Sequence, residues 1–159
     1  MQKPHTAVIR YSTRISTARL APVVGPIGLS IKRVADQIES AAPRQVVGKL
    51  FVHLKFYDRY NYSIKFVAPT MTMIRSSLRT TQIVTLDLVM RVAKRNMVEK
   101  KTFALSLSSA VLEVLGSIKF CHMMVEGETA KEVTKKIQSG LIVIPHASTV
   151  KAWDWDYAI

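Results

Sequence analysis

The chain has 159 residues, of which 48% are apolar, so it is long enough to bury the core of one compact domain or two small ones. Its 23 Lys and Arg against 11 Asp and Glu give a net charge of +12, which favours a nucleic acid as partner over an anionic membrane surface. No apolar run is long enough to span a bilayer, and the single cysteine, Cys121, excludes an internal disulfide.

The N-terminal segment is basic and has no acidic residue before Asp36. Residues 1–20 contain four Lys and Arg among Ser and Thr, a composition typical of a mitochondrial transit peptide. Residues 6–15 are also rich in β-branched and aromatic side chains, which favours a first strand. The segment therefore predicts a mitochondrial protein, although a basic strand explains the same residues.

The next segment predicts a loop followed by a helix. Residues 22–28 contain two Pro and two Gly in seven positions, which indicates a rigid loop. Residues 28–42 carry apolar side chains on one face at helical spacing and polar side chains on the other face. Because Pro43 has no N–H to donate, we expect the helix to end before it.

Two segments of alternating polarity follow and predict an antiparallel hairpin. They comprise residues 46–57 and 60–67, with a short join at Asp58 and Arg59. The apolar face of such a hairpin needs a cover, which the preceding helix supplies. Residues 1–69 are therefore expected to form an N-terminal α/β domain in which an antiparallel sheet has a covering helix.

Residues 70–127 predict a small helical domain, which makes the overall class α+β. Residues 70–78 fit a short first helix, Thr85 fits the N-cap of a second, and Ser106 can cap a third. The third helix carries an apolar stripe at the spacing expected for a helix that packs against a core. That stripe consists of Leu107, Ala110, Val111, Val114, Leu115 and Ile118.

Residues 128–159 are expected to form a separate C-terminal tail. Residues 128–138 form a charged amphipathic segment, and the last seven residues alternate aromatic and acidic side chains. Large aromatic side chains such as Trp153, Trp155 and Tyr157 rarely remain in water without a partner. They are expected either to dock on a neighbouring molecule or to fold back on their own domain.

Basic residues also outnumber acidic ones in the predicted helical domain, where residues 70–120 contain eight Lys and Arg and three Asp and Glu. Arg91, Lys94 and Arg95 fall on the polar face of the second helix, opposite its apolar stripe. One such cluster is usually a solvated helix face, but its coincidence with the net charge favours RNA or DNA binding. The predicted binding site also contains Arg75, Arg79, Lys100 and Lys119.

Gly116 interrupts the third predicted helix, where glycine costs about 1 kcal/mol relative to alanine. It marks either a tolerated kink, a junction of two helices, or a place where another backbone approaches closely. If a helix starts here, its free N–H groups, the Ser117 hydroxyl and Lys119 would suit a phosphate or a ribose 2′-OH. Gly116 and Ser117 therefore join the predicted RNA-binding residues.

Nothing in the sequence indicates catalysis. It contains no Gly-rich phosphate loop, no paired carboxylates and no nucleophile elbow, and its Cys and His residues lack the spacing of metal ligands. We therefore predict no enzyme, no cofactor and no metal site. A free nucleic-acid-binding regulator and a small enzyme with a diffuse site are the alternative functions.

These features, in this order, resemble the large-subunit ribosomal protein eleven family over residues 6–127. The proline-rich residues 22–26 resemble the family's Pro-Pro-Val-Gly-Pro, and residues 56–59 resemble its Tyr-x-Asp-Arg hairpin turn. Residues 67–69 stand where the family has Thr-Pro-Pro, at the junction before its second domain. Residues 116–119, Gly-Ser-Ile-Lys, stand where the family has Gly-Thr-Ala-Arg.

The resemblance implies a structural protein of the large ribosomal subunit. Its C-terminal domain would bind the GTPase-centre fold of large-subunit rRNA, and its N-terminal domain would face translation factors and the ribosomal stalk. It further implies that the proline-rich segment and the facing rRNA form the cleft where thiazole antibiotics such as thiostrepton bind. The residues of this factor- and antibiotic-facing loop are Pro22, Val24, Gly25, Pro26 and Gly28.

The chain also departs from the family pattern. Only Ile27 remains of a longer insert after Pro26, the basic loop before the second helix of the C-terminal domain is cut to residues 79–84, and residues 128–159 lie outside the common pattern. A shortened protein with an acid-free N-terminus is expected in a mitochondrial ribosome, with another organelle or the bacterial cytoplasm as alternatives. Its expected partners are large-subunit rRNA, neighbouring ribosomal proteins including the stalk, and elongation factors, with no membrane.

Overall fold

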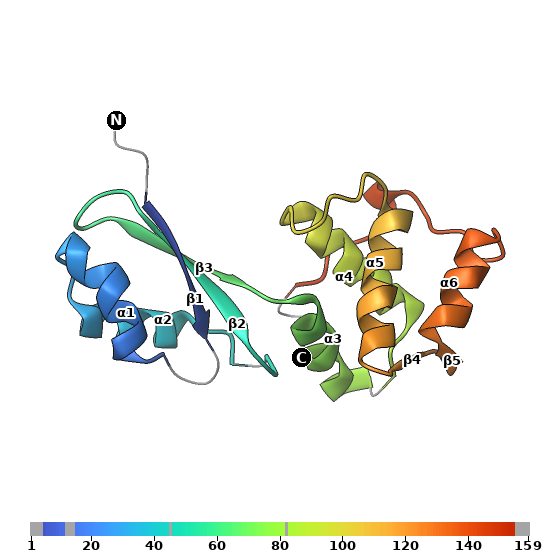
Figure 1. The fold of residues 1–159 in the computed structure, drawn as a ribbon, viewed down its shortest axis with the longest axis horizontal. Coiled ribbons are helices and arrows are strands. Elements are labelled where there is room, and N and C mark those ends of the chain that lie inside the picture. The colour runs from blue at the N-terminus through green and yellow to red at the C-terminus, as the bar shows by residue number, and fades with distance from the viewer. Residues whose placement is uncertain (1–4, 12–14, 45, 82, 155–159) are drawn as a thin grey trace. The chain divides into compact units, whose positions relative to one another are not determined.

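The computed structural model describes residues 5–11, 15–44, 46–81 and 83–154. Contacts divide these residues into two compact units, each of which is considered by itself. The N-terminal unit comprises the described residues up to Arg44 and from Gly48 to Pro69, and the helical unit comprises Val46, Val47 and the described residues from Thr70 onward. An antiparallel sheet with helices in the first unit and helices in the second confirm the predicted α+β class (Figure 1).

The N-terminal unit is built on a three-stranded antiparallel sheet in the order β1-β2-β3. Its strands are β1 (His5–Tyr11), β2 (Leu50–Phe56) and β3 (Tyr62–Val67). Alternate residues of β2 are buried because one face of the sheet lies against helices. Leu50, for example, is 2% exposed and Val52 is fully buried. The antiparallel hairpin is confirmed, but β2 begins four residues later than predicted and β3 two residues later.

The hairpin turns through residues 57–61, a longer loop than the two-residue join expected. The Asp58 carboxylate organises this loop by accepting hydrogen bonds from the backbone N–H groups of Tyr60 and Asn61, both at 2.8 Å. It also accepts one from the Asn61 side-chain amide at 2.7 Å. These donors stabilise the ionised carboxylate and so hold the pKa of Asp58 below its ordinary value.

The prediction of a rigid loop over residues 22–28 is wrong, because most of that segment is helical. Helix α1 (Thr17–Val24) runs through Pro22, and the short 3₁₀ helix η1 (Gly25–Ile27) follows it. Leu20 and Val24 lie one turn apart and are fully buried, so their burial outweighs the hydrogen bond that Pro22 cannot make. Gly28, with φ of 79°, then ends the segment in a conformation that favours glycine.

Helix α2 (Ile31–Ala41) confirms the predicted helix, which begins a little later than expected. The Ser30 side chain caps it by accepting the Arg33 N–H at 3.5 Å. Ala42 is extended, as a residue before proline prefers, so the helix ends where the sequence indicated. Helices α1 and α2 lie side by side and bury their apolar residues against the sheet (Figure 1).

The helical unit is organised around α5, with α3 and α4 on one side and α6 on the other (Figure 1). Its elements are α3 (Thr70–Thr81), α4 (Leu86–Val98), α5 (Leu107–Phe120), β4 (Met124–Val125), β5 (Glu128–Thr129), α6 (Ala130–Gln138) and the 3₁₀ helix η2 (Ala147–Thr149). Thr85 and Ser106 are the N-caps of α4 and α5, as predicted, and each accepts a backbone N–H from three residues further on.

Helix α5 supplies the centre of this core. All six residues of its predicted apolar stripe are buried at 3% exposure or less. The expected interruption at Gly116 is wrong, because α5 continues through it to Phe120. Gly116 lies on the exposed side of α5, while Leu115 and Ile118 on the opposite side are fully buried and hold the helix together.

The segment after residue 127 packs within the helical unit. Helix α6 begins with a capping box between Thr129 and Glu132, and it buries Val133 and Ile137 on its side toward α5. The Trp153 indole is 1% exposed, so of the two expectations for the aromatic residues the fold-back holds for Trp153. Trp155 and Tyr157 lie outside the described residues.

Three hydrogen bonds fix Trp153 in this position. Its indole N–H donates to the Ser77 hydroxyl at 2.9 Å and its backbone N–H donates to the Arg91 carbonyl at 3.0 Å. Its own carbonyl accepts from Nη1 of Arg95 at 3.3 Å. Trp153 therefore ties the C-terminal segment to both α3 and α4.

We expect Trp153→Ala to lower the free energy of unfolding by about 3–5 kcal/mol, because the change leaves a cavity in the core and removes the hydrogen bond from the indole to Ser77. The measurement is urea denaturation of the full chain. Lys151→Ala, at an exposed position two residues earlier, is the control and should change the value by less than about 0.5 kcal/mol. Equal effects of the two substitutions would contradict the packing of Trp153 described above.

Candidate nucleic-acid interface

The predicted RNA-binding residues all belong to the helical unit, but the structure does not bring them onto one surface. They are Arg75, Arg79, Arg91, Lys94, Arg95, Lys100, Gly116, Ser117 and Lys119. Their contacts separate them into residues paired with other groups of the protein, residues gathered at one end of the unit, and residues that lie elsewhere.

Arg91 and Arg95 each form an ion pair with a carboxylate of the protein. Nε of Arg91 lies 2.7 Å from the Asp87 carboxylate, and Nε of Arg95 lies 2.8 Å from that of Glu99. The Glu99 side chain is only 5% exposed, so its ion pair with Arg95 lies largely away from solvent. The Arg95 guanidinium also donates to the Trp153 carbonyl, whereas Arg91 contacts Trp153 only through its main-chain carbonyl.

The ends of α3 and α5 lie at the same end of the helical unit. Val84, just after α3, forms a parallel bridge with Val125, just after α5. The N–H of Glu126 also donates to the Val84 carbonyl at 2.9 Å. The last turns of the two helices, which carry Arg79 and Lys119, therefore point toward the same region.

Several exposed residues collect there, and we call them the basic end: Arg75, Arg79, Gly116 and Lys119. Arg75 precedes Arg79 by one helical turn, so the two exposed guanidinium groups project from one side of α3. Among the described residues, no ion pair involves the three cations of the basic end. Their charges are therefore available to an anion from outside.

Gly116 leaves the surface of α5 open beside Lys119. A Cβ at this position would meet nothing within 4 Å, so no part of the described protein occupies the space in front of it. The expectation that a helix starts here is wrong, because N–H groups in the interior of a helix donate to carbonyls of the preceding turn. Ser117 is half-buried and its hydroxyl donates to the Glu113 carbonyl at 3.4 Å, so this hydroxyl could only accept a hydrogen bond from a ligand.

Lys94 and Lys100 lie away from the basic end. The N-terminus of α4 adjoins that end, since the Leu86 N–H donates to the Glu126 carboxylate at 2.9 Å. Helix α4 has 13 residues and is therefore about 20 Å long. Lys100, which follows its last turn, is separated by that length, and Lys94 is half-buried on its side.

The connection from α4 to α5 presents two apolar side chains that sequence reasoning missed. Phe103 and Leu105 are 101% and 99% exposed. The connection is nevertheless fixed, because the Thr102 hydroxyl donates to the Glu113 carboxylate at 2.5 Å and accepts the Ala104 N–H at 3.0 Å. The signal in the sequence was two large apolar residues alternating with small ones directly after a pair of lysines.

The predicted factor- and antibiotic-facing loop lies at the end of α1 and in η1. Its residues Pro22, Gly25, Pro26 and Gly28 are exposed. Val24 is fully buried and belongs to the core of the N-terminal unit, so it cannot contact a ligand.

The described part of the chain has neither a metal-ligand cluster nor a helix suited to a membrane. Its His, Cys, Asp and Glu side chains form no group of three that would hold a metal ion. None of its helices combines the length and the apolar character that crossing a membrane requires.

No model of a known protein family matches the chain. Proteins named large ribosomal subunit protein uL11 are similar to it over most of their length. One from Encephalitozoon cuniculi is 31% identical over 147 residues, which covers 80% of this chain and 84% of that protein. One from Pyrococcus furiosus is 30% identical over 137 residues, with 77% and 81% covered. One from Archaeoglobus fulgidus is 25% identical over 138 residues, with 79% and 87% covered.

These similarities extend through both units and confirm the resemblance found in the sequence. The chain therefore belongs to the uL11 family of large ribosomal subunit proteins, which are structural proteins and not enzymes.

Proposed function

We propose that this protein binds large-subunit rRNA through the basic end of its helical unit. The observation that carries the proposal is the exposure of Arg75, Arg79 and Lys119 on two helices whose ends a β-bridge holds side by side. Cations that form no ion pair within the protein gain the most binding free energy from RNA phosphates, because each contact releases condensed counterions. Arg91 and Arg95 have less to gain, since their nitrogens already bind carboxylates.

Gly116 gives this surface a place where RNA can come close. Without a side chain, the α5 backbone beside Lys119 is accessible to a ribose or a phosphate. The wide, shallow minor groove of RNA displays its 2′-hydroxyl groups, which a flat helix surface can approach. Gly116 and Ser117 therefore remain in the proposed binding site, but on the side of a helix and not at its start.

The RNA target and the wider role follow from the family resemblance. We propose that the RNA is the GTPase centre at the stalk base and that the N-terminal unit supports translation factors and contacts the stalk. The exposed Pro22 and Pro26 suit such a surface, because a fixed φ reduces the entropy lost when a partner packs on it. A free nucleic-acid-binding regulator remains the alternative, and it would not co-sediment with large ribosomal subunits in moderate salt.

We propose a mitochondrial ribosome as the location, on the basis of the acid-free N-terminus. The fold limits how many N-terminal residues can be cleaved off during mitochondrial import. Strand β1 pairs with β2 along its whole length and buries Ile9 and Tyr11. Cleavage within residues 5–20 would delete or open that strand, so any cleavage is expected before His5.

The double substitution Arg79→Gln and Lys119→Gln should weaken binding to a GTPase-centre RNA fragment. If each residue neutralises one phosphate, the slope of log affinity against log salt should fall by roughly two units. The measurement is filter binding across a salt series. Lys131→Gln with Lys135→Gln removes the same charge from exposed positions on α6 and is the matched control. Identical slopes for the two double variants would show that only net charge matters.

Gly116→Ala should have opposite effects on stability and on binding. The added Cβ meets nothing within 4 Å, so the folded protein should gain up to about 1 kcal/mol from the better helix propensity of alanine. RNA binding should weaken at every salt concentration without a change in salt slope, because no charge is removed. A variant that is stabilised but binds RNA with unchanged affinity would exclude Gly116 from the interface.

Cell fractionation tests the location. A tagged full-length protein is expected in the mitochondrial fraction, where it should co-sediment with large ribosomal subunits. Co-sedimentation with cytosolic ribosomes alone would refute the mitochondrial location and leave the ribosomal role intact.

A further inference from the structure

A pocket in the N-terminal unit lies between the start of α2 and the β2–β3 loop. Its volume is about 420 Å³, a size that accommodates small ligands. The lining residues that carry chemistry are Ser30, Arg33, Arg59, Tyr60 and Tyr62, above the apolar Leu29 and Val34. No Asp or Glu is among the described residues that line it.

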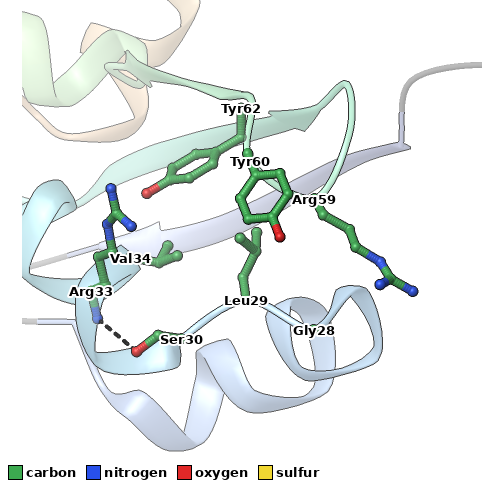
Figure 2. Close-up of a pocket in the computed structure, with 8 residues that line it drawn as sticks. All are labelled: Gly28, Leu29, Ser30, Arg33, Val34, Arg59, Tyr60 and Tyr62. Carbon is green, nitrogen blue, oxygen red and sulfur yellow. Dashed lines mark hydrogen bonds between the residues drawn. The ribbon is translucent and has the colours of Figure 1, made fainter.

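Two tyrosine rings form the centre of this pocket. Figure 2 shows the Tyr60 and Tyr62 rings next to each other, with Leu29 beneath Tyr60. The Tyr62 hydroxyl donates to the Gln37 side chain, which fixes that ring against α2. Tyr60 is 88% exposed, yet its backbone N–H is bound to the Asp58 carboxylate at 2.8 Å. The fixed loop therefore presents the face of an aromatic ring to solvent.

Two arginines flank the rings. Arg33 projects from the first turn of α2 on one side of the tyrosines, and Arg59 projects from the loop on the other side (Figure 2). Neither arginine forms an ion pair with any described residue. Asp58 is next to Arg59 in sequence, but both of its carboxylate oxygens accept hydrogen bonds from Tyr60 and Asn61.

The charge of the chain is also concentrated in this unit. Residues 1–69 contain 11 Lys and Arg against 3 Asp and Glu, whereas residues 70–159 contain 12 against 8. A unit with such an excess needs an anionic partner of its own, since like charges destabilise a compact fold. RNA bound at the basic end contacts the helical unit and is not a partner of the N-terminal unit.

We propose that this pocket binds one unpaired nucleotide of RNA. The base stacks on Tyr60, and Arg33 and Arg59 bind the phosphates on its two sides. Exposed aromatic rings bordered by cations are the usual means of holding unpaired bases. An acidic peptide would pair with the arginines but would leave the exposed Tyr60 ring without a planar partner. This contact is additional to the rRNA binding proposed for the helical unit.

The test uses the full-length protein and a fluorescent octa-adenylate RNA, compared with an abasic octamer of the same charge. All proteins carry Arg79→Gln and Lys119→Gln, which weakens the basic end and separates this result from that proposal. Tyr60→Ala should weaken octa-adenylate binding at least about fivefold and leave abasic binding unchanged, whereas Tyr60→Phe should retain affinity. Tyr57→Ala, in the same loop but outside the pocket, is the control and should have no effect.

The arginines are tested in the same assay. Arg33→Gln should weaken binding of both octamers and lower the salt slope by about one unit, while Arg10→Gln, exposed on β1, should change it less. Equal affinity for the two octamers in the parent protein, or equal effects of Tyr57→Ala and Tyr60→Ala, would overturn the proposal. Displacement of the RNA by polyglutamate with no effect of Tyr60→Ala would assign the pocket to an acidic peptide instead.

Discussion

Burial of the Trp153 indole between α3 and α4 joins the C-terminal segment to the helical unit. The ring is buried and donates to Ser77 on α3, while the Trp153 main chain bonds to the Arg91 carbonyl and to the Arg95 guanidinium on α4. The guanidinium of Arg95 thereby has a protein partner in addition to Glu99, and that of Arg91 is paired separately with Asp87. The basic end, where α3 and α5 finish, carries three exposed cations that form no ion pair with a described residue.

The sequence predicted the elements whose burial follows a simple period. The alternation in β2 and the stripe on α5 specified which face is buried, and Thr85 and Ser106 marked helix starts through local hydrogen bonds. The prediction from sequence failed where local composition and burial favour different structures. Pro22 indicated a loop, but a helix forms because it buries Leu20 and Val24 in the core.

The candidate site was harder to predict, because it depends on partners that are distant in the chain. The pairing of Arg95 with Glu99 was visible as a spacing of four residues, but its bond to Trp153 spans 58 residues. In the same way, Arg33 and Tyr60 come together only when α2 packs beside the hairpin loop. The composition predicted an anionic partner, whereas the fold is needed to show which cations form ion pairs within the protein.

The central claim is that rRNA contacts the basic end and not the polar face of α4. Ultraviolet crosslinking of the full-length protein within purified large subunits, followed by peptide mapping, tests this claim most directly. The account predicts crosslinks in the peptides that contain Arg75 and Arg79 on α3 and Gly116 to Lys119 on α5. Crosslinks confined to the peptides around Arg91 and Arg95, with none on α3 or α5, would contradict it.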